Sequence, residues 1–203
     1  GCADRTVADI VRQIAKTSTV FMLDGAHDPK CNTGGLLSTD NPDDHEILMN
    51  RVVVYEGLHT YGGMAGRTME VLAQGLEEMC DEKEVRWVML QTERFTKRLR
   101  DGGVPLERGC DGAYILTDEF LPHINEHTQD AFSTALYQVS GVRAFAPGRV
   151  DRDHIVPVQI PRLAMTNRQL DQVADAIISL YEQRDRVQPL ALSGGGEWRD
   201  EMQ

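Results

Sequence analysis

The sequence lacks the features that mark membrane, nucleic-acid-binding and disulfide-stabilised proteins. None of its apolar runs approaches the roughly 18 residues that a membrane-spanning helix needs. Basic residues are outnumbered, with 21 Lys and Arg against 32 Asp and Glu, and the net charge of -11 opposes binding to nucleic acid or to an anionic membrane. The four cysteines form no CxxC pair and have no metal-ligand spacing. We therefore expect a globular protein that binds neither nucleic acid nor membranes.

Composition also predicts size class and compartment. With 203 residues, 41% of them apolar, the chain can bury the core of one domain or of one and a half. No basic segment followed by an apolar one marks a secretion signal, and a chain of this size needs no disulfide frame. The sequence therefore predicts a cytoplasmic protein in which Cys31 and Cys80 are small buried thiols.

The most informative stretch is a short apolar segment that enters a polar turn. Residues 19–23 are apolar, residues 24–29 read Asp-Gly-Ala-His-Asp-Pro, and residues 31–39 form a second extended segment. β-branched and aromatic residues bounded by Gly, Asp and Pro predict strand, turn and strand. Because strand ends commonly carry the chemistry of α/β proteins, we expect functional residues in this turn.

The rest of the chain is predicted to alternate between helices and strands. Apolar residues at helical spacing predict helices over residues 6–16, 69–79, 85–99, 128–139 and 166–182. Short apolar runs predict strands over residues 51–55, 104–108, 113–117, 141–146 and 154–160, the first of them a buried parallel strand. Thr6 with Asp9, and Thr166 with Gln169, have the spacing of helix-capping pairs. This order of elements is typical of an α/β or α+β protein.

Five segments carry a combination of motifs: FMLDGAHDPKCNTGGLL, VVVYEGLHTYGGMAGRTMEVLAQGL, LPHI, ALYQVSGVRA and IPRLAMTNRQLDQVADAI. In this order they resemble the tryptophanase and tyrosine phenol-lyase family of pyridoxal-phosphate-dependent β-eliminating lyases, with matches from about Thr6 to Val187. The resemblance implies the PLP-dependent transferase-like fold (fold type I). It also implies that the chain corresponds to the C-terminal half of a family member.

The resemblance places His27 at the position of the lysine that holds the coenzyme as a Schiff base. An amine can form an imine with the coenzyme aldehyde and then move a proton at the substrate α-carbon, whereas imidazole cannot form that imine. His27 can still act as a general base near neutral pH, with the neighbouring Asp28 to orient or charge it. The alternative is a lysine lost from a degenerate subunit. Lys30 is the only nearby amine, and it lies past Pro29 at a different place on the turn.

A second departure concerns the arginine that binds the substrate carboxylate in the family. That arginine begins the motif RLTIPR, whereas this chain reads PVQIPR, so Pro157 occupies its position. Arg162, at the end of the motif, is retained and is the candidate substrate-binding residue. Arg149 and Arg152 in the shortened preceding loop are either substitutes or solvated surface residues. Asp111 stands where the family has the histidine of GGHA.

Two positions of the family's cofactor and cation sites are retained. Tyr61 falls on the tyrosine of YGG and is the candidate cofactor-binding residue beside His27, although a packing role explains it equally. Asn32 falls on the asparagine whose backbone helps to hold a monovalent cation. The resemblance therefore implies such a cation, together with pyridoxal phosphate that is bound noncovalently or through a partner chain.

The resemblance also implies a domain organisation. Residues 1–65 would be the C-terminal strands of the large domain, residues 66–188 the small C-terminal α+β domain, and residues 189–203 a flexible tail. In the family, the aromatic residue that stacks on the coenzyme, the aspartate at its pyridine nitrogen and most of the phosphate loop precede this half. We therefore expect a heteromer with a partner chain that carries the N-terminal half, and further oligomerisation.

Three functions follow as hypotheses. The first is a split tryptophanase-like enzyme that acts on an amino acid or a related small molecule, by β-elimination or by redirected chemistry. The second is a catalytically degenerate structural or regulatory subunit of such a complex, without covalently bound coenzyme. The third, a free-standing small-molecule-binding domain, conflicts with the unpaired apolar sheet edge that the truncated large domain would expose.

Overall fold

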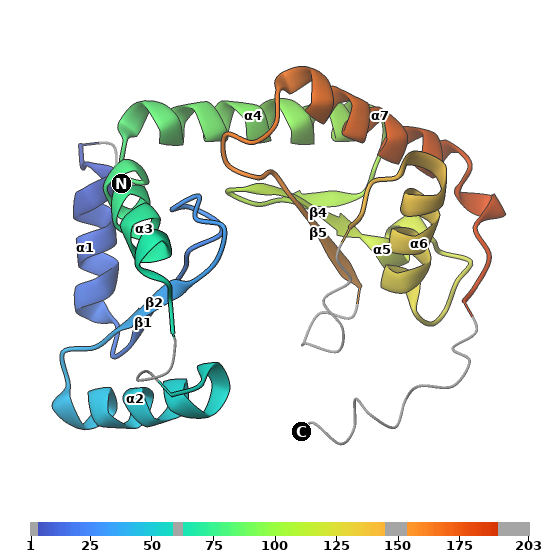
Figure 1. Ribbon diagram of the computed structural model, residues 1–203. Coiled ribbons are helices and arrows are strands. Elements are labelled where there is room, and N and C mark those ends of the chain that lie inside the picture. The colour runs from blue at the N-terminus through green and yellow to red at the C-terminus, as the bar shows by residue number, and fades with distance from the viewer. Residues whose placement is uncertain (1–3, 59–62, 145–153, 191–203) are drawn as a thin grey trace. The chain divides into compact units, whose positions relative to one another are not determined.

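The computed structural model describes residues 4–58, 63–144 and 154–190 (Figure 1). Contacts divide the chain into two compact units. Unit 1 consists of Gly1–Val88 with Pro161–Leu163, and unit 2 of Met89–Ile160 with Ala164–Gln203. The domain boundary predicted after residue 65 refers to the arrangement of a complete family member and stays a prediction.

Unit 1 begins with the elements predicted around the polar turn. Helix α1 (Val7–Thr17) starts at Thr6, whose hydroxyl accepts a hydrogen bond from the Asp9 backbone N–H, as the capping pair predicts. Strands β1 (Phe21–Asp24) and β2 (Gly35–Ser38) then pair antiparallel, with Phe21 opposite Ser38. The predicted strand, turn and second strand are confirmed.

Helix α2 (Pro42–Glu56) replaces the strand predicted over residues 51–55, and that prediction was wrong. The Asn41 side chain accepts a hydrogen bond from the Asp43 backbone N–H, and Pro42 occupies the first helical position. Asp43 and Asp44 lie in the first turn, where acidic side chains complement the helix dipole. These signals start a helix that continues through the valine run to Glu56.

Helix α3 (Gly66–Glu78) and the first part of α4 (Glu82–Asp101) complete unit 1. α3 buries Leu72 and Gly75, whereas Met69 of the predicted apolar stripe is 54% exposed. A Cβ atom on Gly75 would lie 2.0 Å from the carbonyl oxygen of Pro29. Only glycine therefore lets the turn that follows β1 lie directly on α3.

Unit 2 contains a three-stranded antiparallel sheet and most of the buried apolar side chains. Strands β3 (Leu106–Arg108), β4 (Gly112–Leu116) and β5 (Ile155–Gln159) pair in the order β3-β4-β5. The remaining elements are the rest of α4, α5 (Thr117–Phe120), α6 (Thr128–Ser140), α7 (Asn167–Glu182) and the 3-10 helix η1 (Arg184–Arg186). Residues 141–144 form no strand, contrary to the prediction, and residues 145 and 146 lie outside the described part.

The sheet and helices of unit 2 enclose one apolar core. Its fully buried members come from every layer and include Leu99, Ile115, Phe120, Phe132, Leu136, Val156 and Ile177. Thr166 and Gln169 form the predicted capping box at the start of α7. The sheets are small, and the fold agrees coarsely with the α/β expectation.

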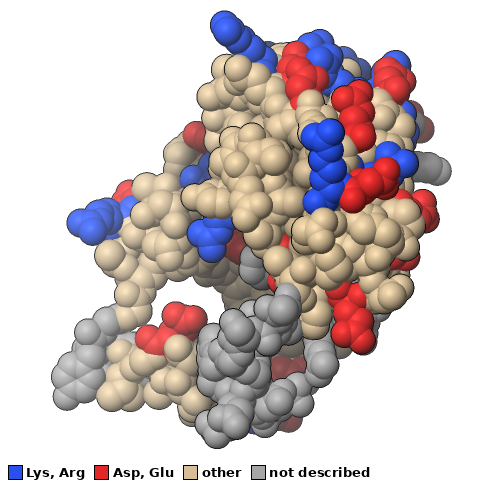
Figure 2. Space-filling view, turned by 90° about the vertical axis from the view of Figure 1, so that its right-hand side faces the viewer, with Lys and Arg blue, Asp and Glu red and all other residues tan. Residues whose placement is uncertain are grey.

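Two observations bear on the predicted surface. No helix in the described part of the chain has the length and apolar character needed to cross a membrane. On the face that Figure 2 shows, acidic and basic side chains lie interspersed.

Candidate functional site

The turn between β1 and β2 has a backbone that is fixed at both ends. The Gly25 N–H donates to the Gly34 carbonyl oxygen at 2.8 Å, and the Cys31 N–H donates to the Gly25 carbonyl oxygen at 2.8 Å. Cys31 is buried, as predicted, with its thiol 3.0 Å from the carbonyl oxygen of Thr33. The polar residues between these bonds therefore form a defined turn.

His27 lies on this turn with an exposed imidazole. Its side chain is 56% exposed, and Nδ1 lies 3.1 Å from Oδ2 of Asp24. The other carboxylate oxygen of Asp24 accepts the Ala26 backbone N–H at 2.8 Å, which fixes the carboxylate in place. A carboxylate at Nδ1 stabilises the N–H on that nitrogen and directs Nε2 to accept a proton. This arrangement suits a general base.

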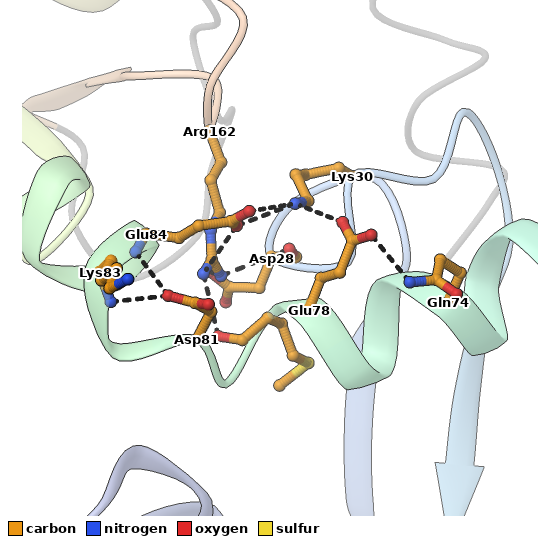
Figure 3. A network of polar contacts seen from close by, with 9 residues as sticks. Asp28, Lys30, Gln74, Glu78, Asp81, Lys83, Glu84 and Arg162 are labelled. Carbon is orange, nitrogen blue, oxygen red and sulfur yellow. Dashed lines mark hydrogen bonds and ion pairs between the residues drawn. The ribbon is translucent and has the colours of Figure 1, made fainter.

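Asp28 contacts an arginine and not the neighbouring His27. Arg162 Nη1 lies 3.3 Å from Oδ1 of Asp28 and 3.4 Å from its carbonyl oxygen (Figure 3). Asp24 is thus the carboxylate that lies beside His27 Nδ1, and the catalytic role of Asp28 stays a prediction.

Arg162 is almost fully buried, with 7% of its side chain exposed. Its Nη2 donates to the Met79 carbonyl oxygen at 2.9 Å and lies 3.6 Å from a carboxylate oxygen of Glu84. Its buried Nε has no hydrogen-bond acceptor in the part of the chain that the structure describes. The retained arginine of the IPR motif thus lies beside the His27 turn, within unit 1.

Lys30 lies between two carboxylates. Its Nζ is 2.9 Å from Oε2 of Glu78 and 2.9 and 3.1 Å from the two carboxylate oxygens of Glu84 (Figure 3). Burial disfavours the charged amine, but the hydrogen bonds to Glu84 and Glu78 outweigh it, and the pKa of Lys30 is raised. An amine that is paired with two carboxylates is a poor nucleophile, which argues against Lys30 as a replacement for the lysine of the family.

The other predicted residues lie away from these contacts or outside the described part. Asn32 is exposed on the same turn. Tyr61, Arg149 and Arg152 lie outside the described residues. Asp111 belongs to unit 2, where its carboxylate accepts a hydrogen bond from the Gln159 side chain at 2.7 Å. Among the residues described, His, Cys, Asp and Glu side chains form no group able to hold a metal ion.

These residues do not fit covalently bound pyridoxal phosphate. The chain has four lysines, Lys16, Lys30, Lys83 and Lys97, and only Lys30 lies in the turn. Its amine is held by Glu78 and Glu84, and imidazole at position 27 cannot form the imine.

Three residues of this site, Asp24, Glu78 and Glu84, were not predicted from the sequence. The link from Asp24 to His27 is local, and an aspartate followed by glycine at a strand end is a recognisable turn signal. Glu78 and Glu84 are 48 and 54 residues from Lys30, and no periodicity relates them to it.

No protein-family model matches the chain. Among curated proteins, the chain is 31% identical to the tyrosine phenol-lyase of Nostoc punctiforme, over 94% of this chain and 44% of that protein. It is 33% identical to the tyrosine phenol-lyase of Fusobacterium nucleatum subsp. nucleatum, over 94% of this chain and 45% of that protein. The chain spans less than half the length of these curated relatives. The comparisons thus support its resemblance to the tryptophanase and tyrosine phenol-lyase family, over somewhat less than half of a member's length.

Proposed function

We propose that this chain is one part of a tryptophanase-like lyase that acts on an amino acid or a related small molecule. A partner chain that carries the N-terminal half of the scaffold completes it. The similarity to a tyrosine phenol-lyase over 94% of this chain supports the family part of this proposal. The partner chain is supported by unit 1, in which neither α1 nor α2 buries a residue.

The observation that carries the catalytic part of the proposal is the contact between His27 and Asp24. An exposed imidazole lies 3.1 Å from a carboxylate, at the residue that the resemblance assigns to the family's coenzyme lysine. In the proposed reaction, His27 Nε2 takes a proton from the substrate, and the Asp24 carboxylate stabilises the imidazolium that forms. Pyridoxal phosphate, which the resemblance implies, would be held noncovalently or through the partner chain, with Tyr61 as the proposed contact of this chain.

Arg162 is the proposed ligand for the substrate carboxylate. Its contacts with Asp28 are long, at 3.3 and 3.4 Å, and Asp28 is 69% exposed. A substrate carboxylate can therefore replace Asp28 at Nη1 and keep the guanidinium paired. The backbone of Asn32 remains the proposed contact for a monovalent cation.

A second candidate function is the catalytically degenerate subunit. It is favoured because both basic side chains near the turn, Lys30 and Arg162, already pair with carboxylates of this chain. Pro157 at the position of the carboxylate-binding arginine points the same way. In this case the chain would support packing or regulation in the complex.

Two measurements on the complex that co-purifies with the chain separate the candidates. For the catalytic proposal, His27→Ala lowers turnover of an amino acid substrate about 10²- to 10⁴-fold, the usual contribution of a general base. His154→Ala, which removes an exposed imidazole in unit 2, leaves turnover unchanged. Turnover that survives His27→Ala would exclude the base and favour the degenerate subunit.

The second measurement concerns the coenzyme. After borohydride treatment of the complex, mass spectrometry of this chain should show no added coenzyme mass. A coenzyme fixed to Lys30 would contradict both candidates, because each rests on the absence of a covalent link to this chain.

A further inference from the structure

The turn that carries His27 contains one residue, Lys30, with an unfavourable backbone conformation. Lys30 has a φ of 58°, in the left-handed region that residues with a Cβ rarely adopt. Its N–H donates to the His27 carbonyl oxygen at 3.2 Å, so this conformation closes the turn directly after the imidazole. A non-glycine residue keeps such a conformation only where its surroundings determine it.

The surroundings of Lys30 do so through charge. The side chain is 21% exposed and its Nζ meets Glu78 at the end of α3 and Glu84 in the first turn of α4. The three contacts of 2.9, 2.9 and 3.1 Å place the ammonium group between the two carboxylates. Without the amine, Glu78 and Glu84 would face each other as like charges.

A second link joins the same turn to the same carboxylate. Asp28 pairs with Arg162, and Arg162 Nη2 lies 3.6 Å from the Glu84 oxygen that Lys30 also contacts (Figure 3). Below the turn, Gly75 brings the backbone of α3 against Pro29. Asp28, Pro29 and Lys30, the three residues after His27, are therefore each fixed to another segment of unit 1.

We propose that Lys30 is a positioning residue. Its ammonium group, held by Glu78 and Glu84, fixes the position of the His27 turn on α3 and α4. The value of this placement for catalysis rests on the proposed function of His27, but the placement itself does not.

Hydrogen exchange of the full chain, together with whatever partner co-purifies with it, tests the proposal. Lys30→Gln should speed amide exchange in residues 24–31 at least about tenfold, because a hydrogen bond to a charged group is worth on the order of a tenfold change in an equilibrium constant. Exchange in residues 66–73 of α3 should change little. Lys30→Arg, which keeps the charge, should restore slow exchange in the turn. Glu77→Gln is the matched control, since Glu77 is exposed on α3 next to Glu78.

Two results would overturn the proposal. One is exchange in residues 24–31 that stays at the wild-type rate in Lys30→Gln. The other is a rise of equal size in α3, which would mean general destabilisation. If Lys30→Gln does not fold, Glu78→Gln removes one carboxylate partner of Lys30 and leaves the contact between Glu84 and Arg162 in place. If His27 has no catalytic role, His27→Ala will leave turnover unchanged. The exchange result in Lys30→Gln does not depend on that outcome.

Discussion

At the scale of single residues, the pair of Lys30 and Glu78 gives unit 1 a defined dependence on pH. The hydrogen bond from Lys30, followed by one from Gln74, lowers the pKa of Glu78 below its ordinary value of 4.5. A carboxylate with a lowered folded-state pKa stabilises the fold above its unfolded value, and this stabilisation is lost as pH falls through the folded value. The raised pKa of Lys30 acts at alkaline pH. Its stabilisation of the fold is fully present below the ordinary value of 10.5 and is lost as pH rises through the higher pKa of the folded state.

We therefore expect Glu78→Gln to lower the free energy of unfolding at about pH 7 and to have less effect at about pH 3. Chemical denaturation of the wild type and of the variant at both pH values measures this difference. Glu77→Gln, one position away, should show no such change with pH. A cost of Glu78→Gln that is the same at both pH values would show that the ion pair does not contribute.

The residue types at the site could be predicted from the sequence, but their pairings could not. The polar turn is visible in the residue types, and the resemblance singled out His27 and Arg162. The sequence neighbour of His27 was expected to orient it, yet the turn brings Asp24 to the imidazole and sends Asp28 to Arg162. Side-chain direction in a tight turn depends on local hydrogen bonds that adjacency does not reveal.

At the scale of elements, capping signals were more reliable than residue preferences. Thr6 and Thr166 begin α1 and α7 as their spacing predicts. The valines at positions 52–54 favoured a strand, but Asn41, Pro42 and two aspartates start a helix ten residues earlier, and it does not stop before Gly57. A strong N-terminal cap therefore outweighed the modest strand preference of three β-branched residues.

The contact between α3 and the turn predicts opposite effects for two glycines of one helix. Gly75→Ala should destabilise the chain by about 1–3 kcal/mol, because the new methyl group meets the Pro29 carbonyl oxygen at 2.0 Å. A Cβ atom on Gly66 would have no neighbouring atom within 4 Å in the described part of the chain. Gly66→Ala should therefore be neutral or stabilising by up to about 1 kcal/mol. Thermal unfolding of both variants measures the difference. Equal stability of the two would show that α3 and the turn are not in close contact.

At the scale of the whole molecule, the two units differ in how much apolar surface they bury. Unit 2 has a core to which helices and sheet both contribute, and its helical stripes were predictable because periodicity reports burial. In unit 1, α2 buries no residue, and its Val54 and Tyr55 are 70% and 77% exposed. Exposed apolar residues on one helix are typical of an interaction surface, and α2 is the surface we propose for the partner chain.

Val54→Glu should therefore weaken association with the N-terminal-half partner at least about tenfold, since a charge replaces a side chain in an apolar interface. Tyr137→Ser is the control, because Tyr137 is 60% exposed on α6 of unit 2. Co-purification followed by light scattering measures both. Wild-type association of Val54→Glu would place the partner elsewhere.

Pro157 has a consequence for the edge of the small sheet. It lies in β5, the outer strand of the order β3-β4-β5, opposite Tyr114 of β4. Because proline has no backbone N–H, an extended peptide that paired with this edge would lack one hydrogen-bond donor at the middle of the strand. Pro157 thereby protects this edge of the small sheet against strand addition and fibre growth.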